Sequence, residues 1–281
     1  MKKLLIFLFV LAISFSVMGT IANADSSILG SADSFVVLAY SGITNSGPTT
    51  ITGDVGSFPT ASATLPVGIT LTGTYYSNTA PVGTAKTDLS TAYTGLNGMA
   101  PTQTLLSAQL DGLNLTYGVY NFKDAPPTVL LDGTLTLNAQ GMNNAYWVFQ
   151  IPAIFTDTGN VVVLNPGSND GVFFVVGSSA SIAGNMEGNI LAYSSITFGT
   201  GATLLNGRAL AENGDVTLLS NTISNVCTNP VGLGFNGGLE YETNGTTVVQ
   251  IGPSSVPEPA TTLLLGLGLM GLVGVSRKIK N

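Results

Sequence analysis

Apolar residues in the central chain recur in short runs separated by glycine and small polar residues. Three such segments begin at Gly171, Gly188 and Gly207, so their starts lie 17 and 19 residues apart. In each segment an apolar run leads through a small polar corner into a strand of alternating apolar and polar residues. Repeats near this length are typical of parallel solenoids, whose single coils must stack to bury their apolar faces. The pattern therefore predicts stacked β-coils, with further rungs at residues 133–137, 146–151 and 161–164.

Residues 84–99 interrupt the strands with a different period. Their apolar residues recur at helical spacing, and Pro101 follows as a stop. A helix at about residues 84–99 is therefore predicted, packed lengthwise against one side of the coil. After Cys227 the rhythm fades, and residues 228–255 are predicted to be a glycine-rich hairpin or linker. The helical face consists of Ala85, Leu89, Ala92, Tyr93 and Leu96.

Threonine occupies many polar positions of the alternating strands. Successive side chains of a strand point to opposite faces, so in residues 50–52 Ile51 points inward and both threonines point outward. The same holds for residues 70–72 and 134–136. Stacked rungs would repeat such groups about every 4.8 Å, and the stiff χ1 of threonine orders its hydroxyl and methyl in advance. This pattern indicates a face that could match a regular, crystalline partner.

The first 24 residues are predicted to be a secretory signal peptide. Lys2 and Lys3 precede an apolar stretch at residues 4–17, and an Ala-x-Ala cleavage pattern closes at Ala24. The alternative, a retained membrane helix, is disfavoured because the apolar stretch is short and a cleavage pattern follows it.

The last 26 residues, 256–281, combine a Pro-Glu-Pro motif, an apolar run at 260–275 and a basic end. This order resembles the PEP-CTERM sorting signal of Gram-negative bacteria. The resemblance implies a short transmembrane helix that anchors the chain transiently in the inner membrane, and cleavage by an exosortase-type enzyme. It also implies secretion to the cell surface or an exopolysaccharide matrix; a plain C-terminal anchor is the alternative. The signal residues are Val256, Pro257, Glu258, Pro259, Arg277 and Lys278.

Charge narrows the range of partners. Only 8% of the residues are charged, against about 25% in an ordinary soluble domain. Residues 25–256 hold three basic and fourteen acidic side chains, a formal net charge of −11. Phosphate binding requires clustered cations, so a nucleic-acid partner is excluded. Hydrophobic residues make up 44% of the chain, which is enough for a sizeable core.

Several phrases of the chain, in order, resemble the microbial ice-binding-like family from about Phe35 to Ile223. Among them are residues 35–39 (Phe-Val-Val-Leu-Ala), 147–151 (Trp-Val-Phe-Gln-Ile) and 206–211 (Asn-Gly-Arg-Ala-Leu-Ala). The resemblance implies that residues 25–227 form an all-β dominated fold, a discontinuous right-handed parallel β-solenoid of triangular section with one long α-helix alongside.

The same resemblance implies an extracellular ice-binding protein that inhibits ice growth or recrystallisation and uses no cofactor. Residues 200–203 also match a Thr-Gly-x-Thr phrase of some members. The ice-binding candidates are therefore Thr134, Thr136, Thr156, Ser181, Thr197, Thr200, Thr203 and Thr217.

Two other classes of function stay open. A structural or adhesive protein of the exopolysaccharide matrix would use the same sorting signal. A polysaccharide-cleaving parallel β-helix enzyme is disfavoured, because the chain has no histidine and few cations to place beside its acids. Because Cys227 is the only cysteine and the chain has no histidine, neither an intrachain disulfide nor a zinc site is predicted. Arg208, with Glu212 and Asp215 nearby, is predicted to form a structural ion pair between rungs rather than to act as a catalytic group.

Overall fold

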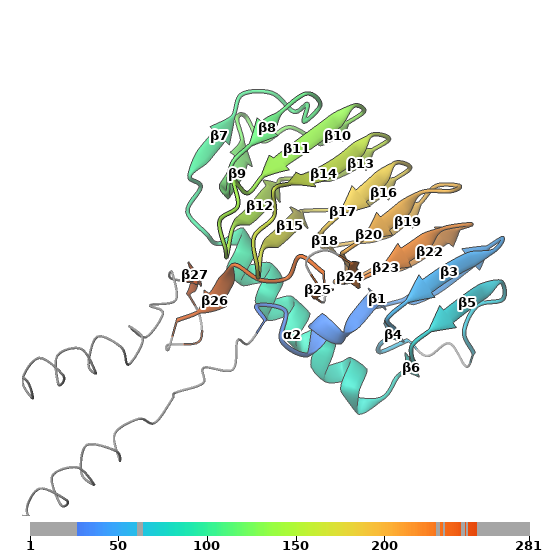
Figure 1. The fold of residues 1–281 in the computed structure, drawn as a ribbon. Coiled ribbons are helices and arrows are strands. Elements are labelled where there is room, and N and C mark those ends of the chain that lie inside the picture. Colours follow the sequence, from blue (N-terminus) through green and yellow to red (C-terminus); the bar gives the residue numbers. More distant parts are fainter. Residues whose placement is uncertain are drawn as a thin grey trace, which may run out of the picture.

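The computed structural model describes residues 27–60, 64–228, 231–232, 234–242, 245 and 247–251. These residues form a β-solenoid with one long α-helix along its side (Figure 1). Three parallel sheets make the walls of the solenoid, and each full coil contributes one strand to each wall. The predicted fold class, a mostly β parallel solenoid with a single α-helix, is confirmed.

The three walls are named sheets A, B and C. Sheet A contains, in spatial order, β6 (Tyr75–Ser77), β4 (Asp54–Ser57), β1 (Phe35–Ala39), β21 (Ala209–Ala211), β18 (Asn189–Ala192), β15 (Gly171–Val176), β12 (Tyr146–Ile151), β9 (Gly118–Phe122) and β7 (Gln103–Leu105). Sheet B contains β10 (Thr128–Leu131), β13 (Ile154–Asp157), β16 (Ala180–Ile182), β19 (Ile196–Phe198), β22 (Asp215–Leu219) and β2 (Gly42–Ser46). Sheet C contains β5 (Ile69–Thr72), β3 (Thr49–Thr52), β23 (Thr222–Ser224), β20 (Thr203–Leu205), β17 (Asn185–Glu187), β14 (Asn160–Leu164), β11 (Thr134–Asn138) and β8 (Asn114–Leu115).

The solenoid is discontinuous, because its first coil lies against its last. Strands β1, β2 and β3 pair in parallel with β21, β22 and β23, respectively. The helix α2 (Ala80–Asn97) then carries the chain from the β6 end of the stack to the β7 end, from which the later coils return (Figure 1). Each wall is therefore completed by residues from both ends of the described chain.

The interior of the solenoid is filled by the inward side chains of all three walls. Three aromatic rings, Tyr120, Phe149 and Phe174, stack along sheet A with centroid distances of 5.4 and 4.9 Å. Phe155 from sheet B stacks on Phe174 at 5.3 Å. All four are almost fully buried. Their contacts fix the spacing of neighbouring coils, so the outer faces of the walls are held by a close-packed core.

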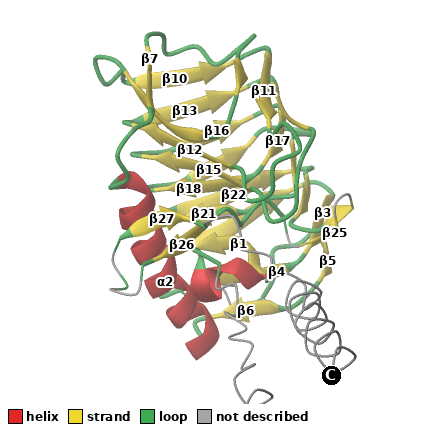
Figure 2. Ribbon diagram, turned by 60° about the vertical axis from the view of Figure 1, so that its left-hand side comes forward, coloured by secondary structure: helices red, strands yellow, loops and turns green. Residues whose placement is uncertain are grey.

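Helix α2 covers the outer side of sheet A (Figure 2). It spans Ala80–Asn97, whereas the spacing of apolar residues predicts 84–99. The earlier start follows from Pro81, which is favoured in a first helical turn, and from Val82, which extends the buried face. Because the helix covers them, β1, β15, β18 and β21 are buried along their whole length. Continuous apolar runs are the sequence mark of strands buried on both faces.

Polar side chains attach the helix to the coils at three levels. The Lys86 ammonium donates to the backbone oxygens of Ala211 and Glu212 at 2.6 and 2.7 Å. The Tyr93 hydroxyl donates to the Val176 carbonyl at 3.2 Å. At the far end, the Gln150 amide of β12 donates to the carbonyls of Leu96, Asn97 and Met99 at 3.0, 3.2 and 2.8 Å.

Replacing Gln150 with alanine is expected to lower the free energy of unfolding by about 1–2 kcal/mol, because carbonyls at the helix end lose their donor. The melting temperature should fall by roughly 2–8 °C in a domain of this size, measured by circular dichroism. Gln103→Ala supplies the control, because Gln103 is exposed on β7. Equal effects of the two substitutions would contradict a role for Gln150 in holding the helix.

The segment after β23 returns along the corner between sheets C and A. It begins with the strands β24 (Cys227–Thr228) and β25 (Val231–Gly232). Phe235 then joins the corner, where its amide donates to Asn206 and its carbonyl accepts from the Val172 amide. The hairpin of β26 (Leu239–Tyr241) and β27 (Val248–Gln250) packs beside α2, with Leu239 and Val248 buried in the cluster under the helix. The described residues between 228 and 251 thus form a strap across the solenoid, outside the stacked coils.

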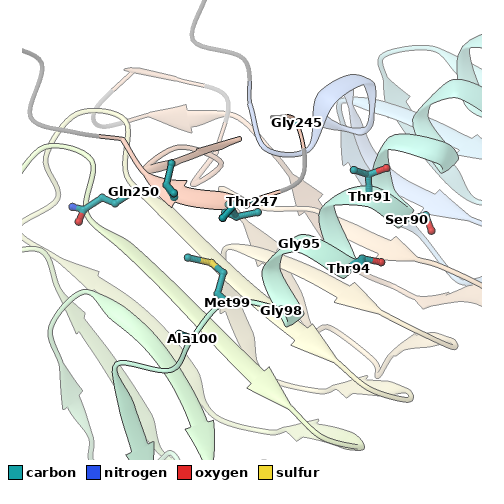
Figure 3. Close-up of a pocket in the computed structure, with 12 residues that line it drawn as sticks. Ser90, Thr91, Thr94, Gly95, Gly98, Met99, Ala100, Gly245, Thr247 and Gln250 are labelled. Atoms are coloured by element: carbon teal, nitrogen blue, oxygen red, sulfur yellow. The ribbon is translucent and has the colours of Figure 1, made fainter. Parts of the chain in front are cut away.

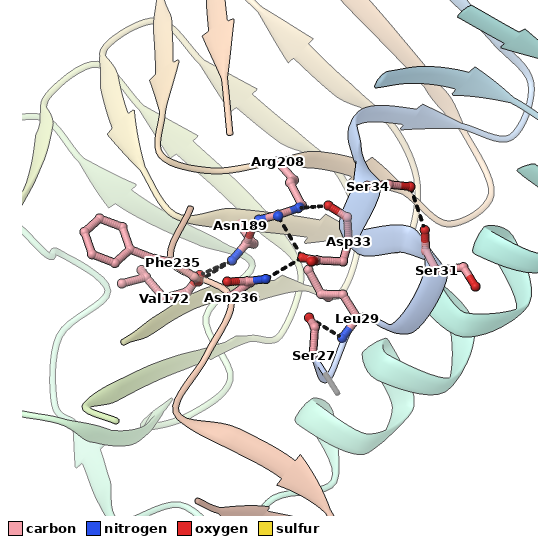
Figure 4. A network of polar contacts seen from close by, with 10 residues as sticks. All are labelled: Ser27, Leu29, Ser31, Asp33, Ser34, Val172, Asn189, Arg208, Phe235 and Asn236. Carbon is pink, nitrogen blue, oxygen red and sulfur yellow. Dashed lines mark hydrogen bonds and ion pairs between the residues drawn. The ribbon is translucent and has the colours of Figure 1, made fainter. Parts of the chain in front are cut away.

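A buried polar network joins this strap to the first residues described (Figure 4). Arg208 is fully buried, and its guanidinium lies 2.7 Å from the carboxylate of Asp33 in the 3-10 helix η1 (Gly30–Ser34). It also donates to the Asp33 carbonyl and to the side chain of Asn189, while Asn236 of the strap donates to the Asp33 carboxylate. The predicted structural ion pair of Arg208 is confirmed, but its partner is Asp33 rather than the nearby Glu212 or Asp215. The side chain points toward the first coil instead, which only the stacking of that coil on the last one brings near.

Candidate functional site

The outer face of sheet B carries a single column of hydroxyl side chains. Thr156, Ser181, Thr197, Thr217 and Thr44 stand side by side on β13, β16, β19, β22 and β2. Neighbouring strands lie about 4.8 Å apart, so the hydroxyls repeat at that interval. Three of the five side chains are exposed and two are partly exposed. These five residues are called the sheet B column.

The residues that alternate with the column are buried, which holds the face level. On β19 the exposed Thr197 lies between Ile196 and Phe198, and on β16 Ser181 lies between Ala180 and Ile182. All four flanking side chains are at most 2% exposed. The strands cannot turn without exposing this core, so each hydroxyl keeps its outward direction.

An exposed acid lies beside the column on β22. Asp215 begins β22 and is exposed, and its carboxylate accepts from the hydroxyls of Ser41 and Ser195 at 3.0 and 3.3 Å. It occupies the row next to the column, at the corner with sheet A. The column itself contains no ionisable side chain. Its outer surface therefore presents hydroxyl and methyl groups without a charge to orient water differently.

A buried carboxylate holds the turn that follows the column on β13. The Asp157 side chain is fully buried and accepts from the backbone amides of Gly159 and Gly184 at 2.9 and 3.2 Å. Burial raises the pKa of Asp157 to about 6, an effect that the two amide hydrogen bonds only partly offset. Asp170 is similar: burial raises its pKa to about 6, against hydrogen bonds from Gly167 and Ala145.

The raised pKa values of Asp157 and Asp170 predict that the folded state is more stable at acidic pH. Their folded pKa values of about 6 exceed the ordinary 3.8, so the folded state binds more protons between these values. The resulting stabilisation is complete below pH 3.8 and is lost as the pH rises through about 6. The melting temperature should therefore rise when the pH falls from 7.5 to 4.5, as followed by circular dichroism. The double variant Asp157→Asn/Asp170→Asn should show a flatter profile; a wild-type melting temperature that falls on acidification would contradict this assignment.

The other ice-binding candidates that lie on strands belong to sheet C. Thr134 and Thr136 lie on β11 and Thr203 on β20, at outward positions. Thr200 lies in the turn between β19 and β20, at the corner of sheets B and C. The candidates are thus divided between two walls: four stand in the sheet B column, three lie on sheet C and one lies between.

In the middle of sheet C, Asn160 and Asn185 interrupt the outward row that contains Thr134 and Thr203. The amide of Asn185 donates to Asn160 at 2.8 Å, and the Thr203 hydroxyl donates to Asn185 at 2.9 Å, so these side chains satisfy one another. In the next outward row Val162 and Leu205 are about 40% exposed, and Glu187 interrupts the row with a carboxyl. This part of the wall is neither uniform in chemistry nor uncharged.

The described residues also form surface grooves outside the stacked coils. A groove between α2 and the β26–β27 hairpin is lined by hydroxyl, glycine and apolar side chains, among them Thr91, Thr94, Met99 and Thr247 (Figure 3). None of its described lining residues is an acid or a base. Within the same described ranges, no group of three or more His, Cys, Asp or Glu side chains could hold a metal ion.

Comparisons with known proteins agree with this geometry. The family model described as "Ice-binding-like" matches residues 37–224, about two thirds of the chain. The chain belongs to the ice-binding-like family. It is 39% identical over 272 residues to an ice-binding protein of Nostoc sp. (strain HG1), covering 95% of this chain and 93% of that protein.

Solved structures of ice-binding proteins share the fold. The crystal structure of one from the Antarctic ascomycete Antarctomyces psychrotrophicus matches with a TM-score of 0.63 at 35% identity, covering 69% of this chain and 96% of that chain. A glycosylated ice-binding protein from an Arctic yeast matches with a TM-score of 0.62 at 28% identity, covering 70% and 93% of the two chains.

The ice-binding-like chain also carries a sorting signal. The model described as "PEP-CTERM protein-sorting motif" matches residues 255–278, which confirms the resemblance read from the sequence. The motif, the predicted transmembrane helix after it and the predicted signal peptide at residues 1–24 all lie outside the described residues. Within the described part of this family member, no helix is long and apolar enough to cross a membrane.

Sequence reasoning missed one member of the sheet B column. Thr44 stands beside Thr217, and their hydroxyls are 3.2 Å apart and hydrogen-bonded. The alternation of Ile43 and Thr44 on β2 marks Thr44 as outward, as it does for the other candidates. The signal was therefore present in the sequence. The sequence does not show that the first coil stacks on the last. That stacking gives this ice-binding-like protein the fifth member of its sheet B column.

Proposed function

We propose that this protein adsorbs to ice through the sheet B column and thereby inhibits ice growth or recrystallisation. The observation that carries the proposal is five hydroxyl side chains on five neighbouring strands in one register. Membership of the ice-binding-like family, whose curated relatives are ice-binding proteins, supports it. Adsorption of this kind requires neither a cofactor nor catalysis.

The rigidity of the threonine side chains explains how a weakly polar face could adsorb to an ice crystal. Threonine has one strongly restricted χ1 angle, and its hydroxyl and methyl are positioned before the ice arrives. Little side-chain entropy is then lost on adsorption, so more of the contact energy contributes to binding. The nearly uncharged surface leaves surface water free to take the order of the crystal.

Sheet B suits this role better than the other walls. Helix α2 and the strap cover the outer side of sheet A. The middle of sheet C contains the hydrogen-bonded Asn160 and Asn185 pair, two protruding apolar side chains and Glu187. Only the sheet B column keeps one type of group on five consecutive strands. The candidates Thr156, Ser181, Thr197 and Thr217 are therefore proposed as ice-contacting residues, together with Thr44.

We infer that the protein acts outside a Gram-negative cell. The PEP-CTERM motif supports transient anchoring in the inner membrane, cleavage by an exosortase-type enzyme and release to the cell surface or an exopolysaccharide matrix. Mass spectrometry of protein recovered outside the cell should show a chain without the residues that follow the Pro-Glu-Pro motif. Recovery of the intact tail in released protein would contradict this processing.

The direct test is the behaviour of ice in a solution of the protein as its host produces it. Thermal hysteresis, shaped crystals and small grains after annealing are expected. A folded sample that leaves melting point, freezing point and grain size unchanged would overturn the proposal. Binding to exopolysaccharide in such an inactive sample would support the structural or adhesive role instead.

A further inference from the structure

Six hydroxyl side chains form a second ordered array at one end of sheet C. Thr222 of β23 stands beside Thr50 of β3, which stands beside Thr70 of β5. In the next outward row Ser224, Thr52 and Thr72 are paired in the same order. The array therefore has two columns on three strands. It is called the sheet C patch and consists of Thr50, Thr52, Thr70, Thr72, Thr222 and Ser224.

The patch is open to solvent and its threonines have unused hydrogen-bonding capacity. Four of its side chains are exposed and two are partly exposed. Within the described ranges, none of its five threonine hydroxyls makes a hydrogen bond to another protein group. In the middle of the same sheet, by contrast, Asn160, Asn185 and Thr203 bond to one another. The patch thus offers its hydroxyls to an external partner.

The geometry of the patch fits a crystalline partner rather than a flexible one. Hydroxyls repeat at about 4.8 Å between strands and at about 6.7 Å between alternate residues of one strand, so the pattern is regular in two directions. Ile51 and Leu71, which separate the threonines along the strands, point toward the core. No residue of the patch is ionisable. A stiff and neutral grid of this kind shares the features assigned to the sheet B column.

The chain reaches this arrangement by joining distant segments. Thr50, Thr52, Thr70 and Thr72 belong to the first coils, whereas Thr222 and Ser224 belong to the last one. The outward hydroxyls continue in register across the junction between them. The walls are different sides of the solenoid, so the patch and the sheet B column cannot lie on one flat crystal plane together (Figure 1).

We propose that the sheet C patch is a second adsorption surface for ice, which engages a different crystal plane, or a second crystal, from the one held by sheet B. The inference rests on the proposed function, since it assigns a second surface to the same activity. Two such surfaces on one rigid body would let a single molecule bridge adjoining ice grains.

The experiment uses the full chain carrying a fluorescent dye and a single crystal of ice grown in its solution. The wild type is expected to mark two sets of planes. Thr50→Tyr places a bulky ring at the centre of the patch and should reduce fluorescence on one set at least about tenfold, as for the loss of a central contact. Thr197→Tyr should remove the other set. Asn114→Tyr, at an exposed residue of β8 at the far end of sheet C, is the control on the same wall and should leave both.

The outcomes separate the two proposals. If Thr197→Tyr removes all fluorescence and Thr50→Tyr resembles the wild type, the sheet C patch is not an ice surface and the proposed function stands. If the wild type marks no plane, both proposals fail. Thr72→Tyr on the edge strand β5 repeats the test at an exposed site, and melting temperatures within about 2 °C of the wild type confirm that each variant is folded. A loss seen with Thr50→Tyr but not with Thr72→Tyr, at equal melting temperatures, would overturn the patch as defined.

Discussion

Replacing Thr197 with tyrosine is expected to raise the protein concentration needed for a given thermal hysteresis by at least about tenfold. Thr197 stands at the centre of the sheet B column, between Ser181 and Thr217. A phenol ring there would project beyond its neighbours and hold the whole face away from the crystal. Obstruction at the centre of an interface commonly costs about 2 kcal/mol or more, which corresponds to more than a tenfold loss of affinity.

The matched control is Thr87→Tyr. Thr87 is exposed on α2, which covers sheet A, and so it lies on another side of the molecule. Both substitutions replace an exposed threonine with the same ring, so they should change the melting temperature to a similar, small extent. Equal hysteresis in the two variants would show that sheet B does not contact ice.

Replacing Arg208 with methionine is expected to destabilise the fold by about 3–5 kcal/mol, and to lower the melting temperature by about 10 °C. Methionine retains much of the apolar stem but leaves the Asp33 carboxylate without its buried cation. It also removes the donor to Asn189 and weakens the site where Asn236 of the strap is held. Urea and thermal unfolding would measure the loss.

A control and a coupled variant identify the cause. Lys123→Met removes an exposed cation and should change stability by less than about 1 kcal/mol. Asp33→Asn combined with Arg208→Met should cost less than the sum of the two single changes, because the pair no longer leaves one charge unmatched. Additive losses, or an Arg208→Met variant as stable as Lys123→Met, would contradict the network as the source of stability.

The sequence predicted which side chains face outward, but not which wall they occupy. Alternation alone places Thr136, Thr197 and Thr217 outside, and the structure agrees for each. Assignment to a wall requires the number of residues in every corner, and the coils vary in length. Thr134 and Thr197 therefore looked equivalent in sequence although they stand on different sheets.

Pairings across the discontinuity could not be predicted at all. Thr44 and Thr217 are separated by 173 residues, and no local period relates them. The ion pair of Arg208 could be predicted but its partner could not, because Glu212 and Asp215 are near it in sequence whereas Asp33 is brought near only by the fold. The helix begins at Ala80, four residues before the predicted start, because Pro81 and Val82 extend it ahead of the stretch with helical spacing.

The meeting of the first and last coils also sets the order in which the protein can fold. Strand β2 is synthesised early but lacks its neighbour in sheet B until β22 has been made. Contacts of such long sequence separation slow folding, because the intervening chain must be ordered before they form. The nascent N-terminal segment can pair early in sheets A and C, where β4 and β5 follow closely, but its sheet B wall stays open. The three-walled stack can close only after the last coil has emerged, so the chain stays incompletely folded for as long as its synthesis lasts.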